Sequence, residues 1–241
     1  MPKAGQDARS RRRGVGVLLL DLMFPPRCAA CGRRGEWLCS TCVAALSPPP
    51  ERCLRCGRAL AYRRRLPLCP ACRRAGSPLS DLLAAHAFEG PLRAAIHALK
   101  YRRAQHLAEP LSALLLALPL PPADLLVPVP LHADRLAERG YNQAALLAVE
   151  VARATGLALD EGVLRRVRST PPQTGLSAAE RRANVAGAFA VAPGAESRVA
   201  GKRVILLDDV CTTGSTLEAA AECLVAARAS EVSGVVLGRV G

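Results

Sequence analysis

Residues 204–217 read VILLDDVCTTGSTL, and this stretch decides the fold of most of the chain. Four apolar residues precede two acids, and a hydroxyl-rich turn that contains Gly214 follows them. A short apolar run bounded by turn residues is typical of a buried strand, and helical periodicity begins near Ser215. The stretch therefore predicts a strand, a tight loop and the start of a helix.

The loop of this stretch has the chemistry of a phosphate-binding site. Backbone N–H groups in such a loop point to one place, and the helix N-terminus adds partial positive charge. Asp208 and Asp209 would repel a phosphate, so the pair makes sense only if the ligand also offers hydroxyl groups, as a ribose does. A capped helix start after a core strand explains the glycine and the threonines, but not the paired acids. The predicted ligand is a phosphorylated sugar.

The segments around this stretch alternate between strand and helix patterns. We expect strands at 81–88, 203–207 and 232–237, a short apolar run at 125–129, and helices at 91–101, 106–118, 132–155 and 215–227. Such alternation indicates an α/β domain with a mostly parallel sheet. Ligands of these sheets bind at the carboxyl ends of the strands, which is where we expect Asp208 and Asp209.

Eight of the ten cysteines form four Cys-x-x-Cys pairs, which are Cys28/Cys31, Cys39/Cys42, Cys53/Cys56 and Cys69/Cys72. The two-residue spacer lets both sulfurs of a pair face one ion, and two pairs complete a tetrahedral thiolate site that suits Zn²⁺. We expect neighbouring pairs to share an ion, with an interleaved arrangement as the alternative. Four protein ligands leave no open position, so both sites are expected to be structural. A redox dithiol or a disulfide framework is the remaining alternative.

Positive charge is concentrated in the first third of the chain. The formal net charge is +13, and residues 1–75 hold sixteen of the 33 Lys and Arg but four of the 20 acids. This asymmetry points to a module that meets a polyanion, and a solvated arginine-rich surface explains it equally well. Outside this first third, Lys100 to Arg103 form either a basic patch beside the predicted phosphate site or a solvated helix end.

No apolar run approaches the ~20 residues that a membrane-spanning helix needs. The run at 15–24 contains Asp21 and no small-residue cleavage site follows it, so it predicts a short amphipathic helix rather than an export signal. Together with metal-binding cysteines, this favours a reducing compartment, the cytoplasm. Aromatic residues make up only 3% of the chain, which leaves few rings to stack on an acceptor base.

Two further segments carry a family resemblance. Residues 127–132 (VPVPLH) with 139–143 (RGYNQ), and 168–177 (RSTPPQTGLS) with 180–185 (ERRANV), resemble the pyrophosphate loop and the flexible catalytic loop of type I phosphoribosyltransferases. The motif at 208–216 resembles their fingerprint for 5-phosphoribosyl-1-pyrophosphate (PRPP). Together with the cysteine pairs, the chain resembles the ComF family of competence-associated proteins over about residues 20–240.

The resemblance implies a fold and a domain order. The fold is a type I phosphoribosyltransferase-like, mostly parallel sheet with helices on both faces, preceded by a small double zinc ribbon. The implied boundaries are a basic segment with a short amphipathic helix at 1–24, the double zinc ribbon at 25–78, and the phosphoribosyltransferase domain at 79–241.

It also implies roles for particular residues. Asp208 and Asp209 would hold the ribose 2′- and 3′-hydroxyls. The 5′-phosphate would lie on Val210, Cys211, Thr212, Thr213, Gly214, Ser215 and Thr216, and the pyrophosphate on the loop of Pro130, Leu131 and His132. Arg181 and Arg182 would close over the pyrophosphate, and Mg²⁺ would bridge it to the ribose.

Two functions follow from the resemblance. In the first, the protein binds PRPP with Mg²⁺, together with single-stranded DNA or a DNA-processing partner, and acts in DNA uptake and natural transformation. In the second, it is an active phosphoribosyltransferase of nucleobase or nucleotide metabolism with a structural zinc module.

Overall fold

A computed structural model describes residues 25–240 except 56–59, 61–67 and 171–177. The helix expected within residues 1–24 lies outside the described residues. Within the described part, no helix combines the length and the apolar character that crossing a membrane requires. The division into segments at 24/25 and 78/79 stays a prediction.

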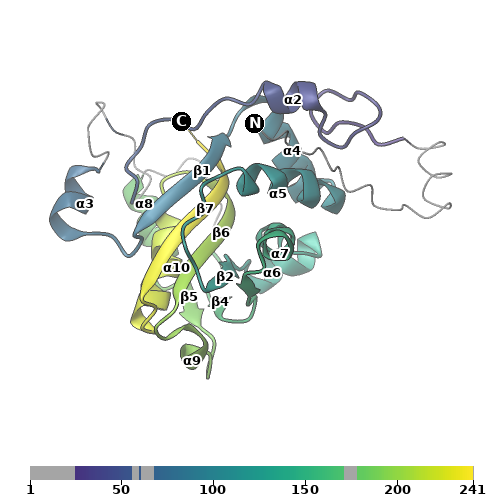
Figure 1. The fold of residues 1–241 in the computed structure, drawn as a ribbon. Helices are drawn as coiled ribbons and strands as arrows, with labels where there is room; N and C mark the ends of the chain where they lie inside the picture. The colour runs from purple at the N-terminus through teal and green to yellow at the C-terminus, as the bar shows by residue number, and fades with distance from the viewer. Residues whose placement is uncertain (1–24, 56–59, 61–67, 171–177, 241) are drawn as a thin grey trace, which may run out of the picture.

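A five-stranded sheet forms the centre of the molecule (Figure 1). Its strand order is β1 (Asp81–Ala87), β7 (Glu231–Arg239), β6 (Arg203–Cys211), β2 (Leu125–Pro128) and β3 (Ala158–Leu159). Every neighbouring pair is parallel. All carboxyl ends therefore meet at one edge of the sheet, and the prediction of a mostly parallel sheet is confirmed.

Helices cover both faces of the sheet, as predicted. One face carries α4 (Gly90–Tyr101), α5 (Ala108–Leu116) and α7 (Gln143–Thr155), and the other carries α8 (Ala178–Val185) and α10 (Ser215–Ala226). Alternate residues of β6 supply the two cores, because successive side chains of a strand point to opposite faces. Ile205 packs under the first group of helices and Leu206 under the second.

The prediction of one helix at 132–155 is wrong, because the structure has two helices there, α6 (Ala133–Arg139) and α7. Gly140 ends α6 with a left-handed φ of 83°. Asn142 then begins α7, and its side chain accepts a hydrogen bond from the Ala144 N–H at 3.0 Å. Glycine commonly ends a helix and asparagine commonly begins one, so the break between α6 and α7 could have been predicted from Gly140 and Asn142.

Several short elements were not predicted. They are the 3₁₀ turn η1 (Gln105–Leu107), the antiparallel ribbon of β4 (Leu164–Arg166) and β5 (Phe189–Val191), and α9 (Glu196–Val199). Each is three or four residues long, which is too short for a hydrophobic period to show.

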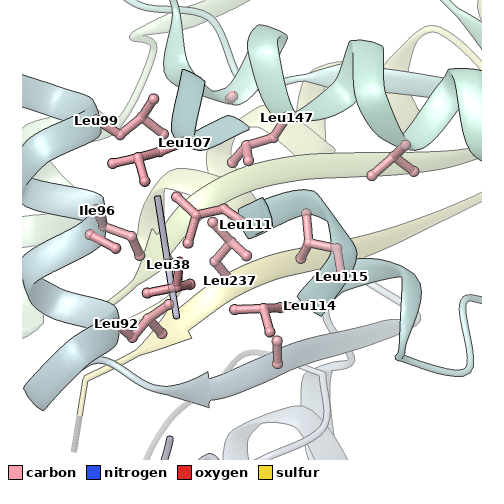
Figure 2. Packing of buried hydrophobic residues seen from close by; sticks show 14 of the residues in the cluster. Leu38, Leu92, Ile96, Leu99, Leu107, Leu111, Leu114, Leu115, Leu147 and Leu237 are labelled. Atoms are coloured by element: carbon pink, nitrogen blue, oxygen red, sulfur yellow. The ribbon is translucent and has the colours of Figure 1, made fainter. Parts of the chain in front are cut away.

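The first cysteine cluster packs directly on the larger domain. Leu38 is 6% exposed and lies in the same core as residues of α4 and α5, where Figure 2 shows it among Leu92 and Leu111. The ring of Trp37 lies on that of His106, with centroids 3.7 Å apart. Helix α2 (Ser40–Ala44) follows this contact, and α3 (Pro70–Ala75) belongs to the second cluster.

Candidate functional site

Strand β6 carries the two acids of the predicted site, and it is longer than the sequence suggested. It continues beyond 203–207 to Cys211, and Asp208 pairs in register with Val236 of β7. The acids thus lie within the strand rather than after its end, and Asp209 is only 3% exposed. The charged pair was taken for the end of the strand because acids rarely lie in a buried sheet.

A cavity of about 270 Å³ opens beyond the acids, over the start of α10. Val210, Cys211, Thr212, Gly214, Ser215 and Thr216 line it together with Asp208. Gly214 takes a left-handed φ of 85° at the helix start, a conformation that glycine adopts without strain. The hydroxyls of Thr213 and Ser215 lie 2.9 Å apart and bond to each other, and Thr213 does not line the cavity. Six of the seven predicted phosphate-loop residues therefore face one space.

A second cavity, of about 280 Å³, adjoins the first at Asp208. The loop after β2 lines it with Pro130, Leu131 and His132, the predicted pyrophosphate loop. Asp208, Lys100 and Thr216 are among the residues that line both cavities. Three segments distant in sequence thus meet at the carboxyl edge of the sheet, where ligands of open α/β sheets bind.

His132 also begins helix α6. Its Nδ1 lies 3.4 Å from the Asp134 backbone nitrogen and 3.1 Å from an Asp134 carboxylate oxygen. This nitrogen is engaged within the helix start, so only the rest of the ring is available to a ligand in the cavity.

The acid pair is held by Lys100, which the sequence placed beside the site as one of two alternatives, and by Gln143, to which it gave no role. The Lys100 Nζ forms an ion pair with the Asp209 carboxylate, and the Gln143 Nε2 donates a hydrogen bond to its Oδ1 at 3.2 Å. The Asp209 backbone N–H donates to Asp208 Oδ1 at 2.8 Å. Residues 100, 143 and 209 are far apart in the chain, so only the fold brings them together.

These contacts give the two carboxyl groups different proton affinities. Burial raises the pKa of Asp208 well above its ordinary value, and the neighbouring charge of Asp209 raises it further. Burial also opposes ionisation of Asp209, but the Lys100 charge outweighs it and lowers the pKa of Asp209. Asp209 is therefore the carboxylate that holds negative charge, and Asp208 is the carboxyl group that takes up a proton more readily.

Basic side chains surround the second cavity, namely Lys100, Arg135, Arg139 and Arg166. The Arg166 Nη2 donates to Thr170 Oγ1 at 2.6 Å, whereas its buried Nε has no hydrogen-bond partner among the described residues. Burial lowers the pKa of Arg166. A buried polar group without a partner calls for an explanation, and an anionic ligand in this cavity would supply one.

Arg181 and Arg182 lie on α8, and their side chains are outside the described part of the structure. The same holds for residues 171–177 of the expected flexible loop. Their closing over a pyrophosphate stays a prediction.

The cysteines gather as two separate clusters. The sulfurs of Cys28, Cys31, Cys39 and Cys42 all lie within 4.8 Å of one another, and so do those of Cys53, Cys69 and Cys72. Cys56, the expected fourth member of the second cluster, lies outside the described residues. Neighbouring pairs thus come together, and four thiolates are the donor set that Zn²⁺ prefers in closed structural sites.

Comparison with known proteins gives two family matches. Residues 138–240 match the model of the phosphoribosyl transferase domain, and residues 19–73 match that of the double zinc ribbon domain. The matched ribbon and the two sulfur clusters support zinc as the metal of this region.

Curated relatives match most of the chain. The DNA utilization protein YhgH of Escherichia coli (strain K12) is 35% identical over 202 residues, which are 79% of this chain and 86% of that protein. Its counterpart in Salmonella typhi is 35% identical over 198 residues, 78% of this chain and 84% of that protein. Competence protein F of Haemophilus influenzae is 33% identical over 190 residues, 75% and 80% of the two chains.

Among solved structures, the glutamine PRPP amidotransferase of B. subtilis in complex with ADP and GMP aligns with a TM-score of 0.38 and 25% identity. The alignment covers 54% of this chain and 25% of that one.

Proposed function

This chain belongs to the ComF family, whose relatives include the DNA utilization protein YhgH and Competence protein F, and we propose that it binds PRPP, or a close relative of it, with Mg²⁺ at the end of β6. One observation carries the proposal. Asp208 lines both the phosphate-loop cavity and the arginine-lined cavity, and the buried Asp209 lines the second, so a ligand that spans the two cavities would meet both phosphate sites and the acids.

Each part of the ligand has a matching surface. The 5′-phosphate would lie on the backbone N–H groups of residues 212–216, where α10 begins. The ribose hydroxyls would bond to Asp208 and Asp209, of which Asp208 can also donate a proton when protonated. The pyrophosphate would face Arg135, Arg139 and Arg166 across the second cavity.

The oxygen donors at this site also fit Mg²⁺, which binds through one or two carboxylates together with substrate phosphates and keeps several waters. Asp208 lines both cavities, whereas Asp209 is already paired with Lys100. Asp208 would therefore be the carboxylate that faces the ion, directly or through water. The ion would neutralise the pyrophosphate oxygens and orient that group.

Titration calorimetry with PRPP and Mg²⁺ tests this site without knowledge of any acceptor. We expect saturable heat from the wild type and none from the Asp208→Asn, Asp209→Asn double variant. The matched control is Asp124→Asn, which removes a carboxylate at the opposite end of β6, where Asp124 pairs with Arg203. Equal affinity in the wild type and the double variant, with both folded, would refute the assignment.

A second candidate function is an active phosphoribosyltransferase. The observation in its favour is the set of arginines on the pyrophosphate side, since stabilising a leaving group is the electrostatic task of such a transfer. Release of pyrophosphate from PRPP in the presence of a panel of nucleobases would establish the activity. Saturable PRPP binding without release for any base would leave a binding protein.

For the biological role we propose DNA utilization in the cytoplasm, with single-stranded DNA or a DNA-processing protein as partner. The names of the relatives and the basic first third of the chain support it. Phosphate contacts make affinity fall with salt, so a salt titration of oligonucleotide binding tests the DNA branch. The full chain is the right sample, because Leu38 and the first cysteine cluster share a core with α4 and α5.

A further inference from the structure

The chain has few aromatic rings, yet several lie together beside the proposed phosphosugar site. Phe88, His97 and Tyr101 all line the cavity over the phosphate loop. The His97 ring centroid lies 6.1 Å from that of Phe88 and 5.5 Å from that of Tyr101. His97 and Tyr101 are four residues apart on α4, so both lie on one face of the helix. The sparse rings of this sequence thus form a row at the mouth of the site.

Tyr101 is not a core residue. It is 66% exposed, more than any other large apolar side chain among the described residues, although it ends a helix whose opposite face is fully buried. Its ring faces a guanidinium, since the Arg139 Cζ lies 5.5 Å from the ring centroid. The attraction between the guanidinium and the ring holds Tyr101 at the surface, and its exposed area stays available to a ligand.

The surroundings of the ring are basic. A cavity of about 120 Å³ beside Tyr101 is lined by Lys100, Arg103, Arg135 and Arg139, with Glu138 as its acid. Arg102 and Arg103 follow Tyr101 directly and are exposed. Lys100 is paired with Asp209, and Arg135 and Arg139 face the proposed pyrophosphate site, which leaves Arg102 and Arg103 as the cations that can meet a phosphate backbone.

We propose that Tyr101, whose ring Arg139 contacts, forms with Arg103 a stacking site for single-stranded DNA. The inference rests on the proposed role in DNA utilization and adds to it the place where the strand lies. Ring faces accept the exposed bases of a single strand, and flanking cations follow its phosphates. In duplex DNA the base faces are stacked inside the helix and cannot contact the ring. An acidic peptide would bind the arginines but would make no use of the aromatic rings.

This placement differs from an interface confined to the zinc ribbon. Tyr101 lines both cavities of the phosphosugar site, so a strand stacked on it would end beside the bound phosphosugar. DNA and PRPP would then occupy adjoining surfaces of one cleft rather than two separate domains.

Fluorescence anisotropy of a labelled oligothymidylate on the full, zinc-loaded chain tests the site. We expect Tyr101→Ala to weaken binding by about 5- to 100-fold, the usual cost of losing one stacked base. Tyr101→Phe keeps the ring and should bind within about twofold of the wild type. Arg103→Gly should lower the slope of log affinity against log salt by about 0.7, the share of one phosphate contact.

Arg228→Gly is the matched control for Arg103→Gly. Both arginines are exposed, both follow a helix, and both have left-handed φ values, 53° for Arg103 and 65° for Arg228. Either change removes one charge and places glycine where it is unstrained, but Arg228 lies beyond the opposite end of α10 from the phosphate loop. We expect Arg228→Gly to bind the oligonucleotide as the wild type does.

Three results would overturn the inference. One is wild-type affinity in Tyr101→Ala when the wild type binds DNA, which would place the strand elsewhere. Another is an equal change in slope for Arg103→Gly and Arg228→Gly, which would mean that only net charge matters. The third is a wild type that binds no oligonucleotide at low salt, or binds thymidine monophosphate as tightly. Calorimetry with PRPP on the same sample reports the phosphosugar proposal separately, so the two failures are distinguishable.

Discussion

The two cysteine clusters share one spacing pattern but have different surroundings. Around the first, Cys28, Cys39 and Cys42 are buried in the same core as α4, α5 and the sheet. Around the second, Cys53, Cys69 and Cys72 form a small core of their own, and the partly buried apolar side chains that pack against it among the described residues are Leu60 and Leu68. The Cys-x-x-Cys pairs therefore determine which metal each cluster holds, whereas the side chains packed around a cluster determine how much of the fold depends on that metal.

The largest expected difference follows loss of one ligand in each cluster. We expect Cys39→Ser to lower the free energy of unfolding of the whole domain by about 4–5 kcal/mol or more, since the metal site it breaks is continuous with the main core. Cys69→Ser should unfold its own ribbon and leave the main transition in place. Denaturant unfolding followed by far-ultraviolet circular dichroism measures both.

Zinc content is the control for this pair. Each variant should lose one of two bound ions, as measured by elemental analysis. Equal loss of global stability in the two variants would contradict the proposed difference between the clusters, because it would mean that the second cluster also supports the sheet.

A smaller loss of stability is expected when the metal ligands stay and only an apolar contact between the first cysteine cluster and the main core is removed. Leu38→Ala removes a side chain that is 6% exposed and packs in the main core, and we expect a loss of about 2–4 kcal/mol. Leu54→Ala is the corresponding change beside Cys53 of the second cluster; Leu54 is 45% exposed, and the change should cost no more than about 0.5 kcal/mol. Chemical denaturation gives both values, and similar costs at the two sites would count against the comparison.

The smallest expected effect is a pH dependence of stability that arises beside the first cluster, at His106. Loss of solvent around His106, whose ring lies against Trp37, lowers the pKa of His106 below its ordinary value of 6.5. The unfolded chain then binds the proton more readily, so stability should fall as the pH drops below about 6.5. Thermal unfolding between pH 7.5 and 5 should show this fall reduced in His106→Gln. An unchanged profile in that variant would mean that other groups cause it.

The sequence predicted most of the fold because long elements carry strong signals. Strands β1, β6 and β7 and helices α4 and α10 appear within a few residues of the expected ranges. The predicted end of β6 was wrong because the buried Asp209 is tolerated inside the sheet through its ion pair with Lys100. No local pattern records such a partner.

The site was predictable where one continuous segment forms it and not where the fold assembles it. The loop at 212–216 and the loop at 130–132 are short motifs, and both line the cleft. Lys100, Arg166 and Gln143 reach the same place from three other elements, α4, β4 and α7, and only the assembled fold brings them there. The clustering of Phe88, His97 and Tyr101 likewise depends on packing, and composition suggested only that rings are scarce.

A crystal structure of the full chain with PRPP and Mg²⁺ tests the account most directly. We predict the 5′-phosphate within hydrogen-bonding distance of the backbone N–H groups of residues 212–216, with both ribose hydroxyls on Asp208 and Asp209. Density for the ligand at any other surface, or the two carboxyl groups turned away from it, would contradict the account.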